Sequence, residues 1–180
     1  EEPVTETSFA DDAQISGWAK GAMEGMKQHG YLQGDGENLS PKAQLTLAHC
    51  SQALSNVYGI RIGAGENTIG EVDGNALVIA AGAVLKNGTI NGDLYISEAV
   101  GNGDVDIDSV TVTGDIYVQG GGRNSVRLIN VVSTTFRVAR PSGVHVDFRD
   151  CAVGPIAAAN MVVFSGNIKD PITVEPGSNI

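Results

Sequence analysis

The stretch Asp93-Leu94-Tyr95-Ile96 decides the fold, because its pattern returns three times farther along the chain. It recurs as Asp115-Ile116-Tyr117-Val118, Thr135-Phe136-Arg137-Val138 and Pro155-Ile156-Ala157-Ala158, at steps of 22, 20 and 20 residues. Repeats of this length are typical of solenoids, in which each repeat forms one coil around a continuous core. We therefore predict a parallel solenoid with about 20–22 residues per coil.

Two further apolar series run in phase with the first. The second series pairs Val105 and Ile107 with Val126 and Leu128 and then with Val146 and Phe148, and the third comprises Val110, Val131 and Cys151. Within each strand, apolar residues alternate with polar ones, which places one set inside and the other in water. Gly101 to Gly103, Gly120 to Gly122 and Ser142-Gly143 recur where the chain must turn with positive φ. The predicted fold is mainly β, a right-handed parallel β-helix over residues 75–180 with three short strands in each of about four to five coils.

The first 58 residues carry a helical period instead. Apolar residues recur on one stripe of a helix, first as Ile15, Trp18, Ala19, Ala22, Met23 and Met26, then as Leu47, Cys50, Leu54, Val57 and Tyr58. Asp11 or Asp12 can cap the first helix, and Gly30 can end it. We predict a small α-helical hairpin over residues 1–58, packed across the loop from Tyr31 to Pro41, and a linker or first turn over residues 59–74.

Five short elements follow one another between about residues 8 and 58. They are Phe9-Ala10-Asp11, Trp18-Ala19, Gly30-Tyr31-Leu32-Gln33-Gly34, Leu39-Ser40-Pro41 and Leu45-Thr46-Leu47-Ala48. In order and spacing they resemble one S-layer homology motif, and the Gly-Asp-(Leu/Ile)-Tyr repeat resembles the β-helical regions found beside such motifs in Gram-positive surface proteins. The resemblance implies a secreted chain anchored to cell-wall polysaccharide, a role that the family usually performs with three motifs around a pseudo-threefold axis.

The last helix of the motif begins with a Thr-Arg-Ala-Glu signature in that family. Thr46, Leu47, Ala48 and His49 stand at these positions here, so the Thr cap is kept while the Arg linked to glycan binding and the Glu of the capping box are replaced. Trp18 and Thr46 are the candidate glycan or assembly contacts. Trp18 can either stack on a sugar or belong to the core.

Charge and cysteine content narrow the partners. The formal charge of −10, from 21 acidic and 11 basic residues, argues against nucleic acid and anionic membrane surfaces. No apolar run approaches the roughly 20 residues that span a bilayer, so membrane insertion is not expected. Cys50 and Cys151 are the two cysteines, and they are interpreted either as reduced, buried side chains or as a single disulfide.

An acidic row is the strongest candidate for chemistry. Asp104, Asp106 and Asp108 are outward positions on one strand, and the next coil places Ser125, Arg127 and Ile129 above them. That stacking favours cross-strand ion pairs over the pair of carboxylates that a polysaccharide hydrolase or lyase needs. Three readings stay open: ordinary solvated residues, a weak calcium site and catalysis.

Two other motifs have structural interpretations. Tyr95 and Tyr117 form an outward ladder, which either stabilises the sheet or offers a small sugar-stacking surface. Gly120-Gly121-Gly122-Arg123 lacks the Lys-Ser or Lys-Thr of a phosphate loop and is predicted to be a turn.

Three functions follow from these observations. The preferred one is a non-catalytic extracellular structural protein without a cofactor, a self-assembling subunit of a surface layer or fibre at the cell surface. The second is a cell-wall polysaccharide-binding anchor module. The third, a polysaccharide lyase or hydrolase remnant, rests on fold analogy alone.

Overall fold

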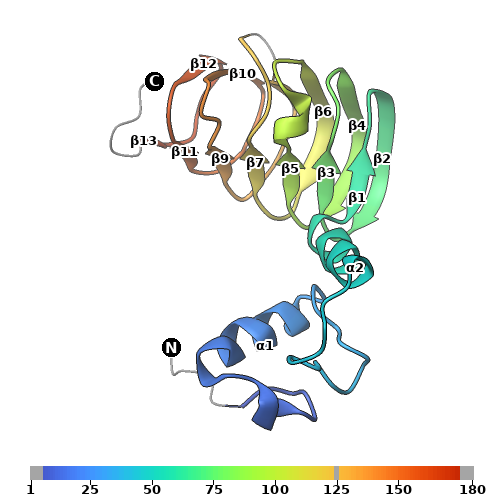
Figure 1. The fold of residues 1–180 in the computed structure, drawn as a ribbon. Helices are drawn as coiled ribbons and strands as arrows, with labels where there is room; N and C mark the ends of the chain where they lie inside the picture. Colours follow the sequence, from blue (N-terminus) through green and yellow to red (C-terminus); the bar gives the residue numbers. More distant parts are fainter. Residues whose placement is uncertain (1–5, 124–125, 175–180) are drawn as a thin grey trace. The chain divides into compact units, whose positions relative to one another are not determined.

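A computed structural model describes residues 6–123 and 126–174 of the chain, which divides into two compact units, Glu1–Val57 and Tyr58–Ile180. The second unit is a parallel β-solenoid of about six turns (Figure 1). Short helices precede it in the chain. The predicted class, a mainly β parallel solenoid after a small helical segment, is therefore confirmed.

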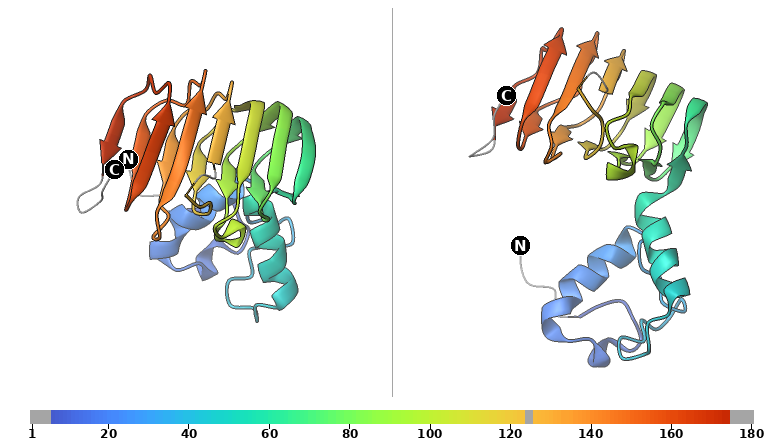
Figure 2. Two further views of the ribbon diagram at one scale, coloured as in Figure 1. Left: turned by 90° about the horizontal axis from the view of Figure 1, so that it is seen from above. Right: turned by 45° about the horizontal axis from the view of Figure 1, so that its top comes forward.

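Two parallel sheets form the walls of the solenoid. The seven-stranded sheet runs in the order β1 (Ile60–Ile62), β3 (Ala76–Val78), β5 (Leu94–Ile96), β7 (Ile116–Val118), β9 (Phe136–Val138), β11 (Ile156–Ala158) and β13 (Ile172–Val174). The six-stranded sheet contains β2 (Gly65–Asp73), β4 (Ala83–Asn91), β6 (Val105–Val112), β8 (Val126–Ile129), β10 (Val144–Arg149) and β12 (Val162–Gly166). Strands of successive coils lie side by side (Figure 2).

The observed register matches the predicted series. Leu94, Ile116, Phe136 and Ile156 are partners in the first sheet, and their side chains are at most 1% exposed. In the second sheet Val105 pairs with Val126, which pairs with Val146. Burying a large apolar side chain stabilises a fold by about 1.5–3 kcal/mol, so each coil adds a comparable increment to one continuous core.

The expected three strands per coil are only partly present. In β4 and β6 the second and third strands form one bent strand, and the bend lies at Asn87 and Ser109, which have φ of 51° and 58°. In the next coils the third strand is reduced to isolated bridges that join Thr111, Val132 and Ala152. A corner made by a single left-handed residue keeps the chain extended on both sides, which explains the merged strand.

The solenoid begins earlier than residue 75. Residues 59–74, expected as a linker or first turn, form β1 and β2, which pair in register with β3 and β4 of the next coil. The repeat was not visible here because β2 is polar, and only Ile69 and Val72 of its nine residues are buried. A sixth coil is thus added to the predicted four to five.

The corner glycines behave as predicted. Gly101, Gly121 and Gly143 adopt positive φ of 60°, 103° and 80° at equivalent corners of three coils. Side chains with a Cβ rarely adopt these angles, so glycine is needed there. A short 3₁₀ helix, η3 (Glu98–Val100), precedes the first of these corners.

The N-terminal unit contains two 3₁₀ turns, η1 (Asp12–Gln14) and η2 (Gly17–Ala19), and two helices, α1 (Lys20–Gln28) and α2 (Leu47–Tyr58), the last of which extends one residue into the second unit. Its buried core consists of Phe9, Ile15 and Ala19, with Met23 and Leu39 packed against it.

The expected helical hairpin is wrong in its packing, because α2 has no buried residue. Leu39, from the connecting loop, packs against the cluster of Phe9, Ile15 and Ala19 that Met23 of α1 also contacts. It takes the place that was predicted for α2. Asp11 fixes that loop, since its carboxylate accepts the backbone N–H groups of Leu39 and Ser40 at 2.9 and 2.8 Å. Leu47 and Leu54 of α2 are thus left exposed, at 83% and 56%.

The expected helix caps are corrected in the same way. Asp11 precedes η1 and Asp12 is its first residue, and neither caps α1, which begins at Lys20. Asp12 instead binds Thr7 and the ammonium of Lys20. Gly30 does follow the end of α1 with φ of 71°, as predicted.

Candidate functional site

The acidic row on β6 is bound by an arginine of the next coil. Arg127 donates from Nη1 to Asp104 at 3.1 Å, and its Nε and Nη2 donate to the two carboxylate oxygens of Asp106. The hydrogen bonds to Asp106 raise the pKa of the Arg127 guanidinium. Register pairs Asp106 with Arg127 and Asp108 with Ile129, as predicted, whereas Ser125 lies outside the described residues.

This pairing changes what the row can do. Two of its carboxylates share one guanidinium, which occupies the position where a calcium ion would collect both groups. The alternation continues one coil farther, because Arg127 is the register partner of Asp147. Asp147 accepts hydrogen bonds from Ser165 and Arg149, and the Ser165 bond contributes most to the lowered pKa of its carboxyl group.

The tyrosine ladder is present on the first sheet. The rings of Tyr95 and Tyr117 stack with centroids 4.9 Å apart, and Tyr58 meets Tyr95 edge-on at 5.4 Å. Each ladder hydroxyl donates to an aspartate of its own coil, Tyr95 to Asp93 at 3.1 Å and Tyr117 to Asp115 at 3.2 Å. Burial and then the neighbouring carboxylates raise the pKa of Tyr117. The rings of Tyr95 and Tyr117 thus stack on each other along the sheet, which supports the interpretation that the ladder stabilises the sheet.

The last described coil leaves its inward residues open to solvent. Ile172 and Val174 of β13 pair in register with Ile156 and Ala158. The latter are 1% and 0% exposed, but Ile172 and Val174 are 37% and 38% exposed. At the opposite end of the sheet, Ile60 of β1 is 44% exposed. Both ends therefore present apolar edge strands among the described residues.

Trp18 does not belong to the core of the N-terminal unit. Its side chain is 89% exposed, although its neighbour Ala19 is buried. The helical stripe on which the core interpretation depended is interrupted, because residues 17–19 form a 3₁₀ turn that rotates Trp18 away from Ile15. Trp18 is therefore available to a partner, as a sugar-stacking or assembly contact requires.

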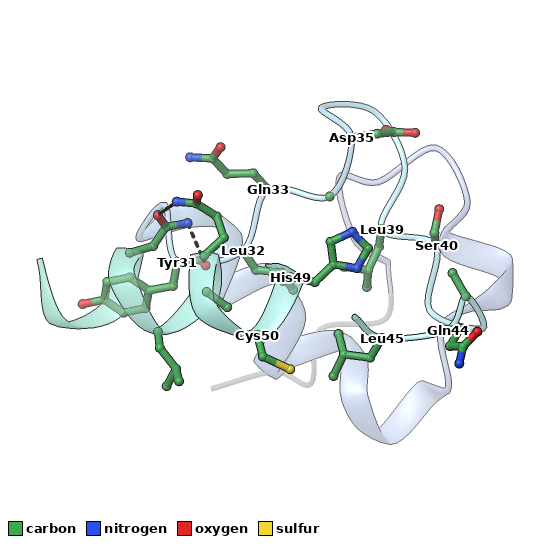
Figure 3. Close-up of a pocket in the computed structure, with 16 residues that line it drawn as sticks. Tyr31, Leu32, Gln33, Asp35, Leu39, Ser40, Gln44, Leu45, His49 and Cys50 are labelled. Carbon is green, nitrogen blue, oxygen red and sulfur yellow. Dashed lines mark hydrogen bonds between the residues drawn. The ribbon is translucent and has the colours of Figure 1, made fainter. Parts of the chain in front are cut away.

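Thr46 caps α2 as predicted, with its hydroxyl accepting the backbone N–H of His49 at 3.2 Å. The helix borders a hollow of about 710 Å³ within the N-terminal unit, where Figure 3 shows His49 and Cys50 of α2 beside Leu39 and Leu45 of the preceding loop. Trp18 is not among the residues that line it. Thr46 does not line it either, so the hollow contains neither candidate contact.

The two cysteines are free in the structure. Cys151 is buried in the solenoid core, where its thiol donates to the carbonyl of Arg149 at 3.3 Å. Burial raises the pKa of this thiol, which disfavours the thiolate. Cys50 is half-buried on α2. The reduced, buried interpretation fits Cys151, and a disulfide between the two stays a prediction.

Sequence reasoning missed two groups of residues. The first group is exposed apolar residues on or beside α2: Leu45 at 71%, Leu47 at 83% and Leu54 at 56%. They are exposed because the loop that Asp11 anchors places Leu39 against the core instead. Arg140 is buried although it is charged. The alternation of Phe136 and Val138 could have indicated this, because Arg140 continues their inward parity.

Within residues 6–123 and 126–174, no group of three His, Cys, Asp or Glu side chains is placed to hold a metal ion. No helix in the same residues is long and apolar enough to cross a membrane. Comparison of the chain with protein-family models, with curated proteins and with solved structures gives no match.

Proposed function

We propose that this chain is a non-catalytic, extracellular structural protein that assembles with copies of itself into a surface layer or fibre. The observation that carries the proposal is the open last described coil, in which inward-facing Ile172 and Val174 are more than a third exposed. A soluble monomer normally covers or blunts such an edge, whereas an assembling subunit leaves it available.

The two ends of the seven-stranded sheet have compatible patterns. Ile172-Thr173-Val174 and Ile60-Arg61-Ile62 both carry apolar residues in the first and third positions, as the strands between them do. Placing β13 of one copy on β1 of the next would continue the parallel ladder. Such a head-to-tail contact uses two different surfaces, and it yields a filament unless rotation closes a ring.

The N-terminal unit supports the same proposal. Leu47 and Leu54 are exposed on α2, and the resemblance of this unit to one S-layer homology motif suggests a partner, because that family usually combines three motifs. The absence of a free carboxylate pair in the Asp104–Asp108 row leaves the hydrolase or lyase hypothesis without an observation in its favour.

The test combines sedimentation velocity with negative-stain microscopy of the purified chain over a wide concentration range. We expect Ile172→Lys to abolish assembly, because it places a charge on the proposed contact, and to keep the monomer folded, because Ile172 is at an end. Ile129→Lys is the matched control, since Ile129 is similarly exposed, at 39%, on the middle strand β8. A wild-type chain that stays monomeric at high concentration overturns the proposal.

Trp18 favours a second candidate, a cell-wall polysaccharide-binding anchor. An indole that is 89% exposed can stack on a sugar ring. Retention on purified cell-wall sacculi measures this function, with Trp18→Ala expected to lose retention and Leu45→Ala, another exposed apolar residue, expected to keep it. Equal retention of both variants and the wild type would remove Trp18 from the site.

A further inference from the structure

A polar hollow of about 460 Å³ lies at one corner of the solenoid, next to Asp104 of the acidic row. Turns from three successive coils border it, and they contribute Asn102, Gly122 with Arg123, and Arg140 with Gly143. Backbone hydrogen bonds hold these turns together, from Gly121 N–H to the Gly101 carbonyl at 2.9 Å and from His145 N–H to the Gly122 carbonyl at 3.0 Å. The hollow is therefore built by the coil stacking itself.

Arg140 is the unusual residue of this corner, because it is only 6% exposed and has no carboxylate partner among the described residues. Its Nη2 donates to the side-chain oxygen of Asn102 at 2.6 Å, and its Nη1 donates to the carbonyl of Gly143 at 3.0 Å. Both acceptors are neutral. A guanidinium has five N–H donors, so donors remain for a further acceptor. A buried charge without a counter-charge is costly, which favours a bound anion.

The other groups around the hollow add to its positive character. Arg123 is exposed at the rim and forms no ion pair within the described residues, and the exposed hydroxyl of Ser142 is a neutral donor. Asp104 is the acidic residue of the lining, but its carboxylate is already bound by Arg127 at 3.1 Å. Two arginines at one corner without an acidic partner in the described part of the chain are unexpected at a net charge of −10.

We propose that this hollow binds an oxyanion, with Arg140 as the buried anchor, Arg123 as the closing cation and Ser142 as an additional donor. Planar guanidinium groups suit carboxylate, phosphate and sulfate oxygens, which they bind through paired hydrogen bonds. The ligand is either a free inorganic oxyanion or the carboxylate of an acidic sugar. The site is independent of the proposed assembly, because it uses neither β1 nor β13.

The experiment is a ¹H–¹⁵N NMR titration of the full chain at constant ionic strength, with sodium sulfate, inorganic phosphate and sodium galacturonate as separate probes and glucose as the neutral control. We expect saturable shifts at Gly122, Arg123 and Gly143. Saturation by sulfate or phosphate alone supports a free inorganic oxyanion, and saturation by galacturonate supports an acidic sugar. Absence of saturable shifts with all three anions overturns the site.

Variants separate binding from structure. Arg123→Ala changes an exposed rim residue, and we expect it to weaken binding about tenfold without altering the fold. Arg61→Ala removes the same charge from the exposed face of β1 and should leave affinity unchanged.

Two further variants test the charge and the shape of the site. Asp104→Asn should strengthen binding by removing a negative charge from the lining. Arg140→Lys should weaken binding because it keeps the charge but loses the planar fork. Equal affinity of Arg123→Ala and Arg61→Ala contradicts the proposal.

Discussion

Phe136 and Phe9 are both buried phenylalanines, but they stand in very different surroundings. Phe136 lies in a solenoid core with 30 buried residues in the described part of the chain, and it meets Phe148 edge-on with ring centroids 5.1 Å apart. Among the described residues, Phe9 has Ile15 and Ala19 as its buried apolar neighbours, and the ammonium of Lys27 lies 4.1 Å from the centre of its ring. One phenylalanine thus packs in the large repeating core of the solenoid, and the other packs in the small core of the N-terminal unit.

The difference teaches how each unit obtains its stability. In the solenoid, each inner coil is covered by the coils on both sides, so stability is distributed along a stack of nearest neighbours. The described part of the N-terminal unit has a core of three buried residues and leaves α2 without a buried residue. We infer that the solenoid is stable by itself and that the N-terminal unit depends on the rest of the chain or on a partner.

Separating the two units is the strongest test of this comparison. Residues 58–180 should fold alone, with dispersed NMR spectra and cooperative unfolding. Residues 1–57 should lack stable structure alone, because chains of this size with so small a core are marginal. Far-UV circular dichroism and ¹H–¹⁵N spectra of the two fragments provide the measurement. Cooperative unfolding of the shorter fragment would break the comparison.

The two phenylalanines permit a matched substitution. Phe136→Ala should lower the free energy of unfolding of the solenoid by about 3–5 kcal/mol, because it removes buried area and leaves a cavity in a rigid stack. Phe9→Ala should speed hydrogen exchange in residues 6–57 and leave the midpoint of solenoid unfolding unchanged. Denaturant titration and regional hydrogen exchange measure both effects. A solenoid that loses equal stability in the two variants would show that the units are coupled.

The cysteines report on the same contrast through their reactivity. Cys50 is half-buried on α2, whereas Cys151 is buried in the solenoid core. We expect a thiol reagent to modify Cys50 at least about a hundredfold faster than Cys151, since Cys151 reacts only after the stack opens. Cys50→Ser is the control that isolates the slow site. A shifted monomer on non-reducing gels would instead establish the disulfide.

The solenoid was predictable because one physical constraint repeats. An inward residue such as Ile116 must be apolar, as its register partners in the coils above and below are. The same apolar positions in the sequence therefore predict both the alternation within a strand and the register between strands. The first coil was not predicted because β2 is an edge strand, where polar residues such as Glu66 and Glu71 are tolerated and hide the apolar repeat. The corners were visible as glycines, but Asn87 and Ser109, which adopt positive φ without being glycine, were not.

The candidate sites were less predictable because they depend on contacts between distant residues. The helical periodicity places Trp18 and Leu47 on apolar stripes. It does not predict that Leu39, a loop residue, packs against the core where α2 was expected. The pairing of Asp106 with Arg127 was predictable, since it follows from the repeat. The burial of Arg140 follows the inward parity of Phe136 and Val138, but its hydrogen-bond partner Asn102 lies 38 residues away in sequence. No local pattern connects these two residues.

The corner residues offer a smaller test of the repeating unit. Asn130 has φ of 52° and stands at the corner equivalent to Ser109, whose hydroxyl its amide approaches at 3.4 Å. Asn130→Ala should cost about 1 kcal/mol, because a Cβ without a local hydrogen bond is disfavoured in the left-handed region. Asn130→Gly should cost less, since glycine adopts this conformation readily. Equal losses would mean that the side-chain bond, and not the backbone angle, matters at this corner.

The smallest expected effect concerns Asp12, which ties the start of the N-terminal unit to α1. Hydrogen bonds from Lys20 and from Thr7 lower the pKa of Asp12 from 3.8 to about 2. Because the folded pKa lies below the unfolded one, this stabilisation is present above about pH 4 and is lost as the pH falls towards 2. The solenoid should keep its structure over the same interval.

An NMR pH titration of the Thr7 amide measures this contribution directly, since that N–H donates to Asp12 at 2.7 Å. Its midpoint should lie near 2 in the wild type, and the transition should vanish in Asp12→Asn. Lys20→Met should move the midpoint upwards because the strongest partner is lost, whereas Lys27→Met, which removes a cation elsewhere on α1, should not. A wild-type midpoint near 3.8 would show that this half-buried pair contributes nothing, as many surface ion pairs do.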